Sequence, residues 1–290
     1  MKCIINRRAQ FFASHRYWLP ELSDDENRAK FGTGSRFPGH GHNYVLYVSL
    51  AGDIDGCGMV MNLSAVKAAI AEHVTRQLDN TYLNTVWPEF QAALPTTENI
   101  AYAIWQRLVP HLPLTAVRLY EHPELWVDYR GNDMQVSLTH KTHFSAAHRL
   151  ARSDFSEAEN YATYGKCARP NGHGHNYHLA VTVTGDMDPR TGMSVDLGAL
   201  IQAIDDRVTE PLDHTFLNLD IPYFSEVVPT AENIALYIAR LLMAPARDLG
   251  VTLETIELIE SPNNSCTIHC RQLAPELALS EAPEPRFAVH

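Results

Sequence analysis

The chain has 290 residues, 45% of them hydrophobic and 20% charged, with a formal net charge of −11. This balance is typical of globular proteins, and the length predicts two domains. The net charge excludes a generally basic nucleic-acid-binding protein, and no apolar run reaches the roughly 18 residues of a membrane span. The polar N-terminal residues and the five cysteines without a Cys-x-x-Cys pair predict a cytoplasmic protein with reduced thiols.

Two copies of one pattern follow each other along the chain. FFASHRYWLP resembles HFSAAHRLAR, and PGHGHNYVLYVSLAGDIDG resembles NGHGHNYHLAVTVTGDMDP. Matching residues lie 133 positions apart at first, as His15 and His148 do, then 134 after one extra loop residue. Near the end, Glu121 pairs with Glu260 at a separation of 139. Ordered matches that slip only in loops indicate a tandem duplication.

Each copy is predicted to begin with two strands joined by a loop. The first strand carries phenylalanine and histidine, as in FFASH and HFSAAH, and the second begins at His-Gly-His. In HGHNYHLAVTV the alternate residues from His173 to Val183 share one face of the strand, because side chains alternate with a period of two. HGHNYVLYV has the same alternation in the first copy.

Two helices and two closing strands complete each copy. Apolar spacing predicts the first helix from about Leu63 or Leu197, and the second follows a threonine N-cap at Pro95-Thr96 or Pro229-Thr230. TAVRLYE and TIELIE predict closing strands. We therefore expect an α+β protein of two ββααββ repeats, each an antiparallel sheet with helices on one face. The expected ranges are residues 1–135, residues 136–277 and a tail over residues 278–290.

Three histidines are expected to converge in each copy. Two of them, at positions i and i+2 of a strand, project to one side, and the histidine of the preceding strand faces the same way. Three neutral imidazoles with a free fourth position are typical of catalytic zinc. A lone histidine is more often a packed core residue, but two matching triads favour metal ligation. The predicted ligands are His15, His40, His42, His148, His173 and His175.

Four further side chains of the second copy carry possible chemistry. Cys167 stands beside basic residues and the predicted metal site, which favours its thiolate as a base or nucleophile. The pair Asp213-His214 has the types of group that orient and polarise a thiol. Glu260 ends an inward-facing alternation, as Glu121 does in the first copy, so each carboxylate needs a donor from the protein or from a ligand.

In order and spacing, CARPNGHGHNY, LDHTFLN, PTAENIA and IESPNN resemble the motifs of the 6-pyruvoyl-tetrahydropterin synthase and 6-carboxy-tetrahydropterin synthase family. The resemblance covers roughly residues 5–130 and 138–272, and the second copy matches more closely. It implies the tunnelling fold, or T-fold, in which the sheets of several protomers form a barrel. It also implies a zinc-dependent lyase that releases triphosphate from 7,8-dihydroneopterin triphosphate, on a biopterin-type or queuosine-precursor pathway.

The family roles carry over to the matching positions of the second copy. The resemblance implies zinc on the second histidine triad, with Cys167 as general base assisted by Asp213 and His214. It implies that Glu260 anchors the pterin ring, as Glu121 would in the first copy, and that Thr230 and Glu232 contact the substrate. The spacing Cys-x5-His resembles the branch that forms the 6-pyruvoyl product, and the 6-carboxy product is the alternative.

The first copy departs from the family pattern at two positions. Gly34 stands where the second copy has Cys167, and Asn80 stands where it has His214. We therefore expect this copy to bind zinc but to be catalytically weak or inactive. Because both substitutions fall in one copy, we expect a homotrimer of chains in which each ring contains one kind of repeat. A non-catalytic zinc- and pterin-binding protein and a purely structural zinc protein are the alternatives.

Overall fold

The computed structural model describes residues 2–273, so the expected tail over residues 278–290 lies outside the described residues. Contacts divide the chain into two compact units. The first unit is Met1–Leu138 with Thr184–Ser194, and the second is Thr139–Val183 with Val195–His290. A segment of the second repeat therefore belongs to the first unit.

The first unit is built on a sheet with the strand order β5-β4-β2-β1-β3. Strands β1 and β2 pair in antiparallel register over their whole length, so that His15 lies opposite His40. The elements are β1 (Lys2–His15), α1 (Asp24–Phe31), η1 (Gly32–Ser35), β2 (His40–Asp53), α2 (Leu63–Ile70), η2 (Ala71–Thr75), α3 (Arg76–Leu78), β3 (Thr81–Tyr82), α4 (Leu83–Val86), α5 (Glu89–Ala92), α6 (Thr97–Leu108), β4 (Leu114–His122) and β5 (Leu125–Tyr129).

The second repeat has the matching strand order β10-β9-β7-β6, and the two-residue strand β8 pairs with β6 in parallel. Its elements are β6 (Gln135–His148), α7 (Glu157–Tyr164), η3 (Gly165–Ala168), β7 (His173–Asp186), α8 (Leu197–Ile204), η4 (Asp205–Thr209), α9 (Glu210–Leu212), β8 (Thr215–Phe216), α10 (Leu217–Asp220), η5 (Pro222–Ser225), α11 (Ala231–Asp248), β9 (Thr252–Ser261), β10 (Asn264–His269) and η6 (Cys270–Gln272).

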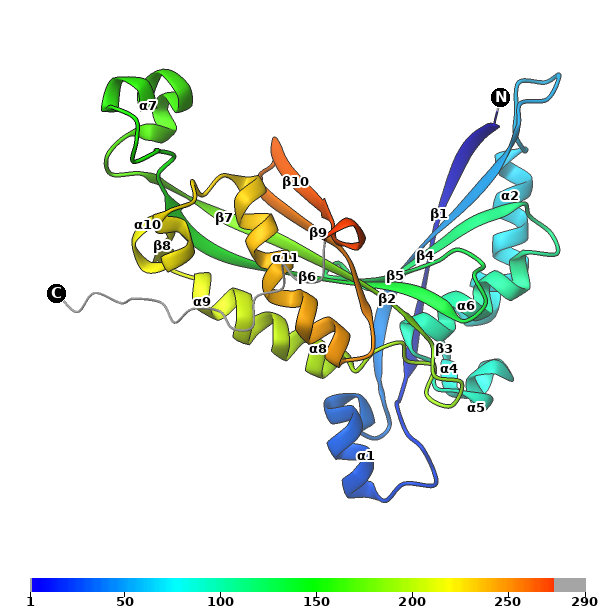
Figure 1. Ribbon diagram of the computed structural model, residues 1–290. Coiled ribbons are helices and arrows are strands. Elements are labelled where there is room, and N and C mark those ends of the chain that lie inside the picture. The colour runs from blue at the N-terminus through cyan, green and yellow to red at the C-terminus, as the bar shows by residue number, and fades with distance from the viewer. Residues whose placement is uncertain (1, 274–290) are drawn as a thin grey trace. The chain divides into compact units, whose positions relative to one another are not determined.

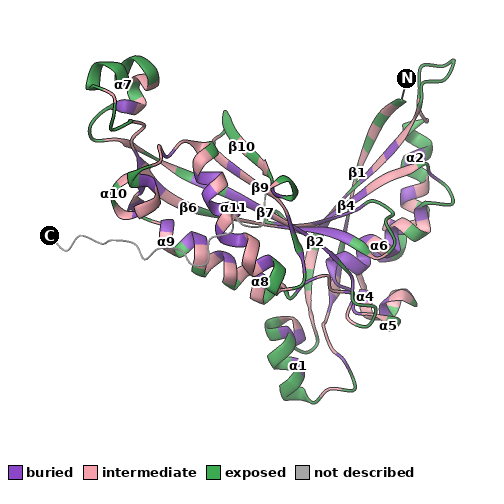
Figure 2. Ribbon diagram, viewed as in Figure 1, coloured by how far each residue is buried: buried purple, intermediate pink, exposed green. Residues whose placement is uncertain are grey.

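Within each repeat the long helices cover one face of the sheet, as the sequence predicts. Helix α6 packs on β4 and β5, and α11 packs on β9 and β10 (Figure 1). The buried side of β2 is the alternating set Tyr44, Leu46, Val48 and Leu50, and β7 repeats it from Tyr177 onwards. Figure 2 shows the contrast between these buried strands and the mostly exposed α1. Burial of this apolar face holds helices and sheet together.

The expected loop between the first two strands is wrong, because it contains a helix in both repeats. Helix α1 begins at a capping box in which Ser23 and Glu26 each bond the other's backbone N–H, and α7 begins in the same way at Ser156 and Glu159. The motif Ser-x-x-Glu is a sequence signature of a helix start. It was available in SDDE and SEAE, but weak apolar periodicity concealed the short helices that follow.

The outer edge of β5 is occupied in the first unit. Strand β5 pairs with β6, whose first residues also belong to that unit. A ring made only of first repeats, joined sheet to sheet, would need this edge to pair with another chain. The structure therefore corrects the expectation that each ring contains one kind of repeat. Among the described helices, each is too short or too polar to cross a membrane.

Candidate metal and ligand site

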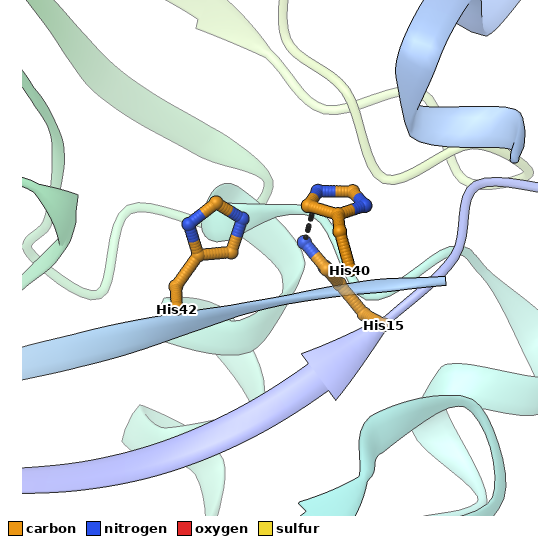
Figure 3. Close-up of side chains that lie close together, drawn as sticks. All are labelled: His15, His40 and His42. Atoms are coloured by element: carbon orange, nitrogen blue, oxygen red, sulfur yellow. Dashed lines mark hydrogen bonds between the residues drawn. The ribbon is translucent and has the colours of Figure 1, made fainter. Parts of the chain in front are cut away.

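The structure brings each histidine triad together at the end of two paired strands. The candidate ligand nitrogens of each triad lie within 4.8 Å of one another. In the first triad, His15 Nε2 and His40 Nε2 are 3.1 Å apart, and Figure 3 shows the imidazoles of all three residues on the same side of β1 and β2. The second triad matches it, with 3.2 Å between His148 Nε2 and His173 Nε2.

Hydrogen bonding fixes the tautomer of the buried histidine in each triad. His15 Nδ1 lies 2.8 Å from the carbonyl oxygen of Pro95, and His148 Nδ1 lies 2.7 Å from that of Pro229. A carbonyl oxygen only accepts, so Nδ1 carries the proton and Nε2 presents its lone pair to the centre of the triad. This is the usual outer-shell arrangement of a metal-binding histidine.

Burial keeps the imidazoles neutral. It lowers the pKa of His15 to about 3 and that of His42 to about 4, and it also lowers the pKa values of His148 and His173. Neutral imidazole is the form that binds a metal ion, because the ligand nitrogen must be deprotonated.

Two further nitrogens support the fit of a metal ion. His42 Nε2 and His175 Nε2 are buried and have no hydrogen-bond partner among the described residues. Buried polar atoms of this kind require an explanation such as an ion. Three imidazole nitrogens per site leave a coordination position for a ligand, and imidazole suits zinc as well as copper, iron and nickel.

A carboxylate lies beside each triad, and the two repeats hold it differently. Glu121 Oε1 is 3.4 Å from His42 Nε2, while its Oε2 accepts a hydrogen bond from the Thr97 hydroxyl. In the second repeat Ala231 replaces that threonine, so the same bond cannot form. Glu260, whose side chain is 15% exposed, has its Oε1 3.8 Å from His148 Nε2. Glu260 is therefore the more available acceptor for a ligand's N–H groups.

Asp213 and His214 lie at a tightly held turn against β6. The His214 N–H donates to the Ser145 carbonyl at 2.6 Å, and the Ser145 N–H donates to Asp213 Oδ1 at 2.7 Å. The second of these bonds, more than the neighbouring imidazole, lowers the pKa of Asp213. Asp213 Oδ2 also bonds His214 Nδ1 at 2.7 Å, and the His214 side chain is 83% exposed. The aspartate thus orients an imidazole that faces outward.

Cys167 does not meet this pair in the described chain. It lies half-buried in η3, where its carbonyl accepts from the Leu150 N–H at 2.9 Å. Among residues 2–273 it makes no hydrogen bond or ion pair with Asp213 or His214. The expected thiol and its expected relay are therefore not assembled by one chain.

Residues at the start of the second long helix differ in what they bind. Thr230 caps α11 through a 3.4 Å bond from Asn233 N–H, and it and Glu232 are partly exposed. Their counterparts in α6 are buried and bonded to the chain itself. Thr96 Oγ1 donates to the Gly192 carbonyl at 2.7 Å, and Glu98 Oε1 accepts from the Ser194 N–H at 3.0 Å. The sequence gave no sign of this contact.

Comparison with known proteins agrees with the repeated architecture. The sequence model of the family "6-pyruvoyl tetrahydropterin synthase" matches the chain twice, over residues 4–132 and 137–270. The chain is 43% identical over 134 residues to the 6-pyruvoyl tetrahydrobiopterin synthase of Pongo abelii and 42% identical to that of Homo sapiens. Each match covers 46% of this chain and 91% of the relative.

A solved structure gives a similar match. The 6-pyruvoyl tetrahydropterin synthase of Caenorhabditis elegans is 36% identical, with a TM-score of 0.45. The match covers 47% of this chain and 96% of that protein.

Proposed function

Because the chain belongs to the 6-pyruvoyl tetrahydropterin synthase family, we propose that its second repeat, over residues 136–277, is a zinc-dependent pterin synthase site. Its substrate in this proposal is 7,8-dihydroneopterin triphosphate, and inorganic triphosphate is released. The first repeat, over residues 1–135, is a metal-binding scaffold without its own turnover.

One contrast between the repeats carries this proposal. The second repeat has a thiol at Cys167, a carboxylate-bound imidazole at His214 and an available acceptor at Glu260. The first repeat keeps its triad but has Gly34 and Asn80 at the first two of these positions. Its own carboxylate is already bonded to a threonine hydroxyl. Only the second repeat retains groups that can hold a pterin and move a proton.

The residues of this chain have distinct tasks in the proposed reaction. His148, His173 and His175 would hold zinc, which supplies Lewis acidity that makes C–H bonds beside a coordinated oxygen easier to deprotonate. Glu260 accepts the N–H groups of the pterin ring and fixes its orientation. The Cys167 thiolate removes a proton from a side-chain carbon of the substrate, and Asp213 keeps the His214 imidazole oriented for proton exchange.

The overall change needs no external redox cofactor. Loss of triphosphate from the side chain is coupled to oxidation of the side-chain carbons, and the pterin ring takes up the two electrons as it becomes a tetrahydropterin. We propose the 6-pyruvoyl compound as the product, supported by the spacing of Cys167 and His173 and by the names of the relatives at 42–43% identity. The 6-carboxy product, formed with acetaldehyde, is the alternative.

The separation of Cys167 from His214 supports a site completed by another copy of the chain. Neither residue has an obstacle of sequence, yet the two do not meet within the described chain. We therefore propose a homo-oligomer, with barrels closed between chains. The number of chains, three in the sequence-based expectation, stays a prediction.

The experiment is incubation of the purified zinc-loaded chain with 7,8-dihydroneopterin triphosphate. We expect inorganic triphosphate and a pterin with the mass of the 6-pyruvoyl product from wild type, and neither from Cys167→Ala. Cys3→Ala, which removes a thiol from β1 far along the chain from the triads, is the matched control and should retain activity. Acetaldehyde release would indicate the 6-carboxy product, and pterin binding without triphosphate release would favour the non-catalytic alternative.

A further inference from the structure

Each repeat carries a loop between its second strand and its first helix. The first-repeat loop is residues 54–61, IDGCGMVM, and the second-repeat loop is residues 187–195, MDPRTGMSV. Although one is a residue longer, both contain a glycine with left-handed backbone, Gly58 at φ +79° and Gly192 at φ +73°.

The two loops also share their internal hydrogen bond. The aspartate N–H donates to the carbonyl of a methionine at 2.9 Å in both, from Asp55 to Met59 and from Asp188 to Met193. Each loop is therefore held in the same conformation by its own residues, before any outside contact.

The second-repeat loop is docked in the first unit, on the start of α6. Besides the bonds of Gly192 to Thr96 and of Ser194 to Glu98, Met193 packs against a buried cluster. That cluster consists of Leu19, Phe31 and Leu94. The docked loop thus combines a polar contact at the helix start with an apolar side chain in a prepared pocket.

The first-repeat loop has the same shape but no comparable cover among the described residues. Met59, the counterpart of Met193, is 39% exposed. Ile54 is 46% exposed, while its counterpart Met187 is buried. Exposed apolar side chains gathered on one preformed loop are typical of an interaction surface.

The second unit has a cavity of about 1020 Å³ at the position that corresponds to the first unit's dock. In the first unit the docked loop meets Leu19, Glu21, Phe31, Ala92, Leu94, Thr96 and Asn99. The matching residues of the second repeat all line the cavity: Arg152, Asp154, Tyr164, Glu226, Val228, Thr230 and Asn233. The chain therefore contains one occupied dock and one open dock of the same construction.

The charges of the open dock suit the shorter loop. In the occupied dock, Arg190 of the loop pairs with Glu21 through its Nε at 2.7 Å. The first-repeat loop has no arginine. In the open dock Arg152 itself pairs with Asp154, with 2.9 Å between Nε and Oδ1, so the loop need not bring a cation.

We propose that the first-repeat loop of one chain docks in the second-unit cavity of a second copy. Met59 enters the space beside Val228, the Thr230 hydroxyl donates to the Gly58 carbonyl, and Glu232 accepts from the Val60 N–H. These contacts repeat the ones that Met193, Gly192 and Ser194 make in the first unit. They assign Thr230 and Glu232 to assembly, where the family resemblance implies substrate contacts.

The test uses disulfide formation between chains. Met59→Cys chains are mixed with Val228→Cys chains, both in a Cys57→Ser background, and oxidised. We expect a covalent dimer on a non-reducing gel that appears in the mixture and in neither variant alone. Met193→Cys with Leu94→Cys in one chain is the matched control, because its cysteines replace side chains already in contact and should link within a single chain.

A second measurement protects against a misleading geometry of the cysteines. Met59→Asp places a charge on the loop and should lower the sedimentation mass of the assembly toward that of fewer chains, with unchanged circular dichroism. The proposal is overturned if the in-chain control links and the mixture does not. It is equally overturned if Met59→Asp leaves the mass of the folded protein unchanged.

Discussion

Each imidazole triad combines three features: strand pairing sets the spacing, a backbone carbonyl fixes one tautomer, and burial favours the neutral form. The sequence predicts the first of these, because His-Gly-His on a strand and a histidine on its partner must share a face. The carbonyl partners at Pro95 and Pro229 could not be read from spacing, since they come from a segment about 80 residues away.

We predict that His173→Ala lowers the bound zinc from close to two ions per chain to close to one. Removing one of three imidazoles leaves too few ligands at the second triad and does not touch the first. Metal analysis of purified protein after dialysis measures this. Unchanged zinc content in the folded variant would show that these histidines are not the ligands.

We predict that the metal-free protein loses stability as the pH falls from about 6.5 toward 3. The folded pKa values of His15 and His42, about 3 and about 4, lie below the ordinary value of 6.5. The unfolded chain therefore takes up protons in this interval that the folded chain does not, which favours unfolding at the lower pH. Urea unfolding midpoints in the presence of a chelator measure the effect.

The matched control for this titration is His122→Gln, which removes a largely exposed histidine outside the triads. Its unfolding midpoint should decline with pH as steeply as that of wild type. A flat midpoint between pH 6.5 and 4 in the metal-free wild type would mean that the triads are not kept neutral in the folded state.

At the scale of elements, hydrophobic periodicity was sufficient for the strands and the two long helices of each repeat. It failed for α1 and α7, whose residues are mostly exposed and whose starts are marked only by capping boxes. It also could not show that the second-repeat loop belongs to the first unit. That contact joins residues nearly 100 positions apart through backbone groups, which carry no sequence signal.

We predict that Gly192→Ala destabilises the protein more than Gly250→Ala. Both glycines have left-handed backbone, at φ +73° and +78°, so a side chain costs each roughly 1–2 kcal/mol. A Cβ at Gly192 would also lie 2.8 Å from Asn99 Cβ, whereas at Gly250 it meets nothing within 4 Å. Overpacking adds about 1–3 kcal/mol. Equal shifts in the thermal midpoint would contradict the docked position of the loop.

At the scale of the whole molecule, duplication is the feature that the sequence predicts best, because matched motifs recur in order across 270 residues. The manner of assembly was not accessible in the same way. Rings of like repeats followed from the distribution of Cys167 and His214, but strand pairing at β5 takes up the edge that such rings need. Edge pairing is set by backbone hydrogen bonds, and these are weakly specified by side chains.

The central claim is that chemistry belongs to the second repeat and depends on its metal ligands. The most direct measurement is the turnover of 7,8-dihydroneopterin triphosphate by His173→Ala beside His40→Ala, each confirmed to be folded. These are matching ligands of the two triads. We predict that kcat/KM falls roughly 100-fold or more in His173→Ala. In His40→Ala it should stay within about threefold of wild type, because each 1.4 kcal/mol of lost transition-state binding would be tenfold. Equal losses in both variants, or full activity in His173→Ala, would contradict the account.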